Sequence, residues 1–129
     1  MRSYHPATVA LAIRRDQRWI DNVLSRHHVL GVESEGRGVA RRLSLEAAVR
    51  LAIIGTLEAA FGAPIQRAVD VTNQLGPEDK QVHPAPGIVL TVDFDGLALS
   101  VERSLYEVMQ HHVPPRRGRP PAKGAAAQL

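Results

Sequence analysis

The sequence predicts a mainly α-helical protein with a small β component. Three observations predict this fold class. Apolar residues recur at helical spacing in several stretches between residues 8 and 75, and a Gly- and Arg-rich loop over 31–44 separates two of these stretches. A β-branched run over 88–94 alternates as a strand does. We therefore expect a helical body that carries a basic hairpin, or wing, and a separate strand.

Length and composition narrow the class of protein. A chain of 129 residues suits one domain with a tail. The chain has no cysteine, which excludes disulfides, thiolate zinc sites and cysteine nucleophiles. It shows neither an apolar run of membrane-spanning length nor a signal peptide, so we expect a cytoplasmic protein without a membrane partner.

Charge is divided along the chain. Residues 1–42 hold eight Arg against four acidic residues, and residues 43–113 hold four basic against nine acidic residues. Residues 114–129 hold four basic residues and no acidic one. Basic ends around an acidic middle suggest that the ends meet a polyanion, although a solvated surface without a partner would have the same composition.

The first two predicted helices are short and close together. Thr8 is a suitable cap for the first helix, and Asp16 for a second helix that runs from Gln17 to about His27. In the second helix apolar residues occupy one face, and the other face carries Gln17, Arg18, Asn22 and Arg26. This layout is typical of a helix-turn-helix whose recognition helix enters the major groove, where Arg pairs with guanine and Asn or Gln with adenine. An ordinary amphipathic helix with a polar solvent face remains the alternative.

The glycine-rich loop that follows is the wing candidate. Arg37 lies between two glycines, and Arg41 and Arg42 end the loop. Glycine allows the backbone to approach a ligand closely, and arginines offer phosphate or minor-groove contacts. We expect the nucleic-acid contact on these three arginines.

Two longer helical patterns follow the wing. Ser44 caps a predicted helix over 45–61 with a single broad apolar stripe that includes Ala60 and Phe61, and Gly62 ends it. Pro64 then begins a helix over 65–75.

Together these elements resemble the winged helix-turn-helix domain of the MerR family. The resemblance covers residues 8–75 and rests on the order of the elements, on Arg-Arg-Leu-Ser-Leu-Glu over 41–46 and on Phe-Gly-Ala-Pro-Ile over 61–65. It implies DNA binding through the recognition helix and the wing. Gln17-Arg-Trp-Ile-Asp-Asn22 replaces the Thr-Leu-Arg-Tyr-Tyr run usual in that family, and no cysteine-based effector site is present. Metal or redox sensing is therefore not implied.

Residues 77–113 form a predicted strand-helix extension to a winged helix-turn-helix domain over 1–76. Residues 76–87 are Pro-rich and predict an irregular connection, and a strand follows over 88–94. Asp95-Gly96 is either a hairpin turn into a second strand over 97–101 or the start of a helix capped by Asp95. The apolar stripe continues past residue 101, which favours the helix. We expect the strand to pair with the wing or with a second subunit, and the extension to form a homodimer.

Residues 114–129 predict a disordered basic tail. Its Arg116, Arg117, Gly118 and Arg119 precede a proline and resemble an AT-hook, which lies in the narrow minor groove of A·T-rich DNA.

These features predict a small sequence-selective transcriptional regulator that binds double-stranded DNA in the nucleoid. We expect no enzyme activity, catalytic residue, metal or cofactor, because the histidines lack metal-ligand spacing and no phosphate-binding motif is present. One alternative is a protein-interaction adaptor, antitoxin-like or used in phage assembly, that binds a protein partner through residues 77–113. Another is an excisionase-like architectural protein that bends DNA.

Overall fold

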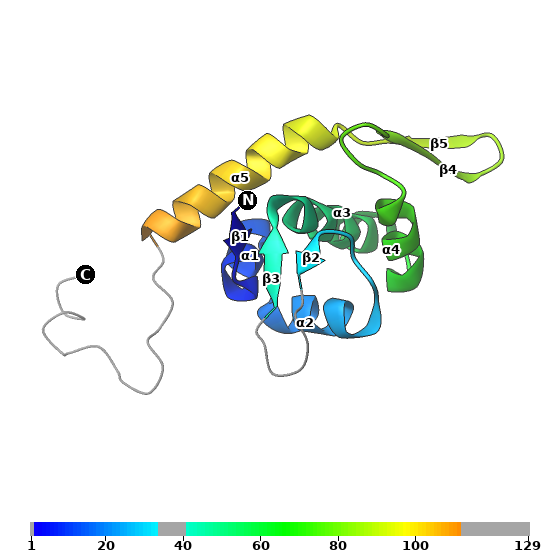
Figure 1. Ribbon diagram of the computed structural model, residues 1–129. Coiled ribbons are helices and arrows are strands. Elements are labelled where there is room, and N and C mark those ends of the chain that lie inside the picture. Colours follow the sequence, from blue (N-terminus) through cyan, green and yellow to red (C-terminus); the bar gives the residue numbers. More distant parts are fainter. Residues whose placement is uncertain (1, 34–40, 112–129) are drawn as a thin grey trace, which may run out of the picture.

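The computed structural model describes residues 2–33 and 41–111 (Figure 1). In these residues the fold is mainly helical with a small β component, which confirms the predicted fold class. The helices are α1 (Pro6–Ile13), α2 (Gln17–Arg26), α3 (Leu45–Phe61), α4 (Ile65–Asn73) and α5 (Phe94–His111). The strands are β1 (Ser3–Tyr4), β2 (Val32–Glu33), β3 (Arg42–Ser44), β4 (Gln81–Ala85) and β5 (Ile88–Thr91).

Helix α1 begins earlier than predicted. His5, not Thr8, is its N-cap, and the Nδ1 atom of His5 accepts a 3.1 Å hydrogen bond from the Ala7 N–H. Pro6 then occupies the first helical position, where its missing N–H costs nothing. The Thr8 prediction is wrong because a proline at the start of the helix is the stronger signal.

Helix α2 matches its prediction to within one residue. Asp16 occupies the N-cap position, although its side chain makes no capping hydrogen bond to the part of the chain described. Ile20 and Val23 are buried.

Strand β3 is the centre of a three-stranded antiparallel sheet in the order β1-β3-β2. Tyr4 and Val32 both lie opposite Leu43, which is fully buried. The segment that joins β2 to β3, residues 34–40, contains Arg37 and lies outside the described residues.

Helix α3 is the centre of the core. Ser44 caps it as predicted, because the Ser44 Oγ atom accepts a 3.1 Å hydrogen bond from the Ala47 N–H, and Gly62 ends it with a φ of 68°. The prediction of a single apolar stripe is wrong in part. Ala47, Ala48, Leu51 and Ile54 are buried as well, whereas Phe61 is 75% exposed. The helix contacts α1, β3, α4 and α5, so residues on more than one of its faces are buried, whereas Glu46, Thr56 and residues 59–61 are exposed.

Helix α4 follows Pro64 and buries Ala68, Val69 and Thr72. It ends at Asn73, two residues before the predicted end, although Leu75 is also buried in the core. Arg50 of α3 secures this end, because its Nη2 atom donates a 2.8 Å hydrogen bond to the Leu75 carbonyl oxygen.

The Pro-rich segment over 76–87 is not the irregular connection that the sequence predicted. Residues 76–87 contain β4, which pairs in antiparallel register with β5, and Gly87 between the two strands has a φ of 80°. The strand over 88–94 is therefore shorter than predicted, ending at Thr91, and its partner in this chain is β4, not the wing. Proline is tolerated here because both strands of an isolated hairpin are edge strands. The hairpin projects from the helical body (Figure 1).

Residues 97–101 belong to α5, so the second-strand alternative is wrong. Asp93, not Asp95, caps the helix, because its Oδ1 atom accepts a 3.1 Å hydrogen bond from the Gly96 N–H. Asp95 instead forms a 2.8 Å ion pair with Lys80, and this hydrogen bond raises the pKa of Lys80. Helix α5 packs against α1 and α3 and buries Phe94, Val101, Leu105 and Val108.

Candidate nucleic-acid interface

The outer face of α2 presents a row of polar side chains. Gln17, Arg18, Asn22 and Arg26 are all exposed, while Ile20 and Val23 on the opposite face are 0% and 3% exposed. Arg18, Asn22 and Arg26 are spaced four residues apart, so they form one line along the helix. This line offers two guanidinium groups and one amide to a ligand.

The connection between α1 and α2 is a tight turn over residues 14–16. Arg14 has a φ of 60°, in the left-handed region that non-glycine residues seldom adopt. The Arg14 side chain is exposed beside the start of α2. Arg14 is not among the predicted site residues, although the adjacent Arg14 and Arg15 are a basic signal that the sequence displays.

Arg15 anchors this turn to α3. Its Nη2 atom donates a 2.6 Å hydrogen bond to the Gly55 carbonyl oxygen and lies 3.4 Å from the Glu58 Oε1 atom. Its guanidinium carbon stands 4.4 Å from the centroid of the Trp19 ring, and the Trp19 indole N–H donates a 3.0 Å hydrogen bond to Glu58. The inner side of α2 is therefore fixed to α3 by polar contacts as well as by apolar packing.

Asn73 of α4 holds the chain that leaves α2. Its Nδ2 atom donates a 2.7 Å hydrogen bond to the His28 carbonyl oxygen, and its Oδ1 atom accepts a 3.2 Å hydrogen bond from the Leu30 N–H. One side chain thus fixes the path from α2 to β2. No local pattern in the sequence indicates this contact, because the partners are 43 and 45 residues apart.

The two described arginines of the wing candidate differ in their surroundings. Arg42 is exposed on β3, and its guanidinium donates hydrogen bonds of 3.1 Å and 3.0 Å to the Oγ and carbonyl oxygen atoms of Ser3. Arg41, immediately before β3, is half-buried. The predicted phosphate contact of Arg42 would therefore come from a side chain already held against β1.

Helix α1 contacts both α2 and β3, so the α2 row and the base of the β2–β3 hairpin belong to the same part of the molecule (Figure 1). Six of the predicted site residues lie in the described part of the chain, on α2 or at the start of β3: Gln17, Arg18, Asn22, Arg26, Arg41 and Arg42. The other five, Arg37, Arg116, Arg117, Gly118 and Arg119, lie outside the described residues.

No helix in 2–33 or 41–111 combines the length and the hydropathy needed to span a membrane. No group of three His, Asp or Glu side chains in these ranges is arranged to hold a metal ion. Comparison of the chain with protein-family models, with curated proteins and with solved structures found no match.

Proposed function

We propose that this chain is a small double-stranded DNA-binding protein with a winged helix-turn-helix, and that it acts as a transcriptional regulator in the nucleoid. The observation that carries the proposal is the exposed row Arg18, Asn22 and Arg26 on a helix that is anchored from its inner side. The succession of two short helices joined by a turn of three residues supports the role of α2 as a recognition helix.

The chemistry of the row suits base edges. An arginine guanidinium can donate two hydrogen bonds to guanine, and an asparagine or glutamine amide can both donate to and accept from adenine. Fixing the inner side of α2 through Trp19 and Glu58 lowers the entropic cost of ordering these groups on DNA. In this proposal Gln17, Arg18, Asn22 and Arg26 read the major groove.

The connectivity of the sheet supports the same proposal. Strand β1 precedes α1, and strands β2 and β3 follow α2, so a three-stranded sheet encloses a helix pair. In winged proteins the loop between the last two strands reaches the DNA beside the recognition helix. We assign Arg41 and Arg42, at the base of that loop, to the flanking backbone, and we propose Arg37 for the loop itself.

Two further elements complete the proposal. The tail residues Arg116, Arg117, Gly118 and Arg119 would bind an A·T-rich minor groove, and tethering them to the domain raises their effective concentration at the DNA. A homodimer would double the number of bases read, since one short helix contacts too few for useful selectivity.

Single arginine substitutions test the assignment. Fluorescence anisotropy with a fluorescein-labelled duplex, selected from a random pool for tight binding to the unmodified chain, should show weaker binding by roughly tenfold for Arg18→Ala, an effect of about 1.4 kcal/mol. Arg67→Ala, which removes an exposed arginine from α4, is the matched control and should leave the affinity unchanged. Equal affinity of Arg18→Ala and the unmodified chain would contradict the assignment of α2 as the recognition helix.

A protein-interaction adaptor is the second candidate, and exposed apolar side chains outside the α2 region favour it. Ile88 and Val89 of the β4–β5 hairpin are 56% and 50% exposed, and α5 exposes further apolar residues. An adaptor would retain its protein partner in the Arg18→Ala variant and would show no DNA affinity in either form.

A further inference from the structure

Helix α5 has two apolar faces. The first, with Phe94, Val101, Leu105 and Val108, is buried against the chain's own α1 and α3. A second face, about a third of a turn round the helix, exposes large apolar side chains: Leu99 is 65% exposed, Tyr106 59% and Met109 50%. A surface helix that packs only on its own domain needs one apolar stripe, so the second stripe requires an explanation.

The second stripe has the spacing of a helix-helix seam. Asp95, Leu99, Glu102, Tyr106 and Met109 are separated by four, three, four and three residues. This alternation places the five residues along one line of the helix, as in the seam between two packed helices. We call these five residues the α5 seam.

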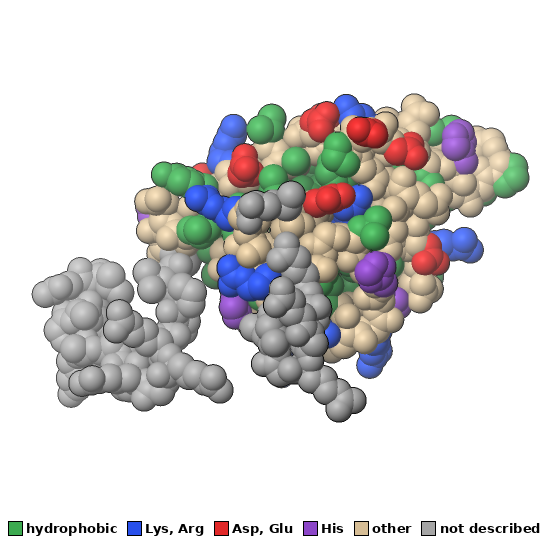
Figure 2. Space-filling model, in the orientation of Figure 1, with side chains coloured by type: hydrophobic (Ala, Val, Ile, Leu, Met, Phe, Trp, Pro, Cys, Tyr) green, Lys and Arg blue, Asp and Glu red, His purple; other side chains and the backbone are tan. Residues whose placement is uncertain are grey.

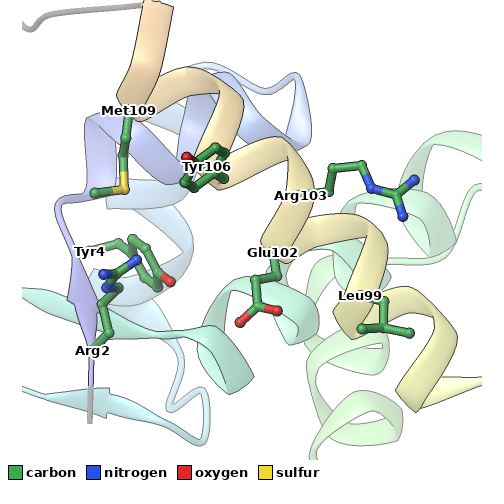
Figure 3. A pocket seen from close by; sticks show the side chains of 7 residues that line it. All are labelled: Arg2, Tyr4, Leu99, Glu102, Arg103, Tyr106 and Met109. Atoms are coloured by element: carbon green, nitrogen blue, oxygen red, sulfur yellow. The ribbon is translucent and has the colours of Figure 1, made fainter.

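A groove runs beside the seam. It has a volume of about 390 Å³ and lies between α5 and the N-terminal strand, lined by Arg2, Tyr4, Leu99, Glu102, Arg103, Tyr106 and Met109. In Figure 3, Glu102 and Met109 lie on the side of the helix that faces Arg2 and Tyr4, whereas Arg103 points to the other side. The seam residue Glu102 therefore brings a carboxylate to the groove, and the Arg103 guanidinium lies beside the seam on its other side (Figure 3).

We propose that a second copy of this chain packs its own α5 seam against this one. The charged side chains that line the groove favour a second copy over a partner of one charge sign. The groove along the seam carries both signs, with Glu102 beside Arg2 and Arg103, so a strongly acidic or a strongly basic partner would meet like charges. A copy related by two-fold symmetry presents the same mixture, and its Leu99, Tyr106 and Met109 cover the exposed apolar groups.

Figure 2 is consistent with this partner. Over the part of the surface that α5 occupies in Figure 1, hydrophobic side chains alternate with acidic and basic ones, and neither sign of charge forms a continuous patch. The proposal depends on α5 and on the N-terminal strand beside it, and it stands whether or not the chain binds DNA.

Sedimentation equilibrium of the full chain over a wide concentration range tests the proposal. We expect twice the 14.1 kDa chain mass. Leu99→Glu and Tyr106→Glu should each weaken dimerisation by roughly tenfold or more. Phe61→Glu, which changes a 75% exposed apolar residue of α3, should leave it unchanged. A monomer at every concentration, or a dimer that resists both seam variants, would overturn the proposal.

A second measurement guards against seam variants that fail to fold. Because the chain has no cysteine, Arg103→Cys gives a single attachment point for a nitroxide label. In the seam dimer the two labels lie beside the contact, since residue 103 adjoins Glu102 of the seam, and electron paramagnetic resonance should show strong dipolar coupling between them. Phe61→Cys, at the end of α3, is the matched control and should show weak coupling. Weak coupling at residue 103 in a sample that sediments as a dimer would overturn the proposal.

Discussion

Trp19 of α2 and Glu58 of α3, 39 residues apart in the chain, share a 3.0 Å hydrogen bond from the indole N–H to the carboxylate. The same Oε1 atom of Glu58 lies 3.4 Å from the Arg15 guanidinium. The Glu58 carboxylate thus contacts two segments, the turn before α2 through Arg15 and the first turn of α2 through Trp19. The angle at which α2 presents its outer face depends on this contact.

Replacing Glu58 should therefore affect both stability and DNA affinity. We expect Glu58→Ala to lower the free energy of unfolding by about 1–2 kcal/mol, because the Trp19 N–H and the Arg15 guanidinium both lose a partner that is only 33% exposed. Urea denaturation measures the stability, and anisotropy the DNA affinity. Glu78→Ala, an exposed acidic residue after α4, is the control. Identical unfolding midpoints for the two variants would contradict the anchoring role.

Replacement of Gly55 by alanine should destabilise the fold, although alanine favours helices. A Cβ atom at this position would stand 2.9 Å from the Arg15 Nε atom and 3.1 Å from Nη2. The guanidinium would have to leave the Gly55 carbonyl oxygen, so we expect Gly55→Ala to cost about 1–3 kcal/mol of unfolding free energy. In an Arg15→Ala background the cost should disappear. A double-mutant cycle without coupling between the two positions would refute this account.

Among the described basic residues, Arg50 should be the one whose replacement lowers the free energy of unfolding most. Its side chain is 3% exposed, donates to the Leu75 carbonyl oxygen and lies 5.5 Å from the centroid of the Phe94 ring. It also forms a 2.5 Å ion pair with Glu46. Arg50→Ala removes contacts with α3, with the segment that follows α4 and with α5 together, so we expect a loss of about 3–5 kcal/mol of unfolding free energy. Thermal unfolding followed by circular dichroism measures it, and a loss no larger than that of Arg67→Ala would contradict the prediction.

The two aspartates at the start of α5, Asp93 and Asp95, have different roles and should differ in their contribution to stability. Asp93→Ala removes the N-cap hydrogen bond to Gly96 and should cost about 1 kcal/mol. Asp95→Ala removes only an exposed ion pair with Lys80, and its effect should be smaller. Urea unfolding of the two variants side by side makes the comparison, and an Asp95 effect larger than the Asp93 effect would show that the cap is misassigned.

Local signals predicted the elements that local chemistry determines. Asp16, Ser44 and Gly62 mark helix ends in the structure at the predicted positions, and the alternation of apolar residues located α2 and α5. These signals act within one or two turns of helix. The exposed row on α2 was predictable for the same reason, since it follows from helical periodicity alone.

Contacts between distant segments could not be predicted in this way. The bond from Arg15 to Gly55 spans 40 residues, and the bonds of Asn73 span 43 and 45. The strand β4 was missed because Pro84 and Pro86 flank its end, and proline excludes a central strand but not an edge strand. The exposed end of α3 was missed because burial depends on which elements surround a helix, which its own periodicity does not reveal.

Salt-dependent DNA binding tests the proposed function most directly. The full chain is titrated into an A·T-rich and a G·C-rich random duplex at two salt concentrations, and fluorescence anisotropy gives the affinity. We predict binding to both duplexes at low salt that weakens steeply as salt rises, because arginines displace condensed counterions from phosphate, together with a preference for the A·T-rich duplex that Arg117→Ala/Arg119→Ala removes. No binding to either duplex at low salt would contradict the proposal and leave the protein-interaction adaptor as the better description.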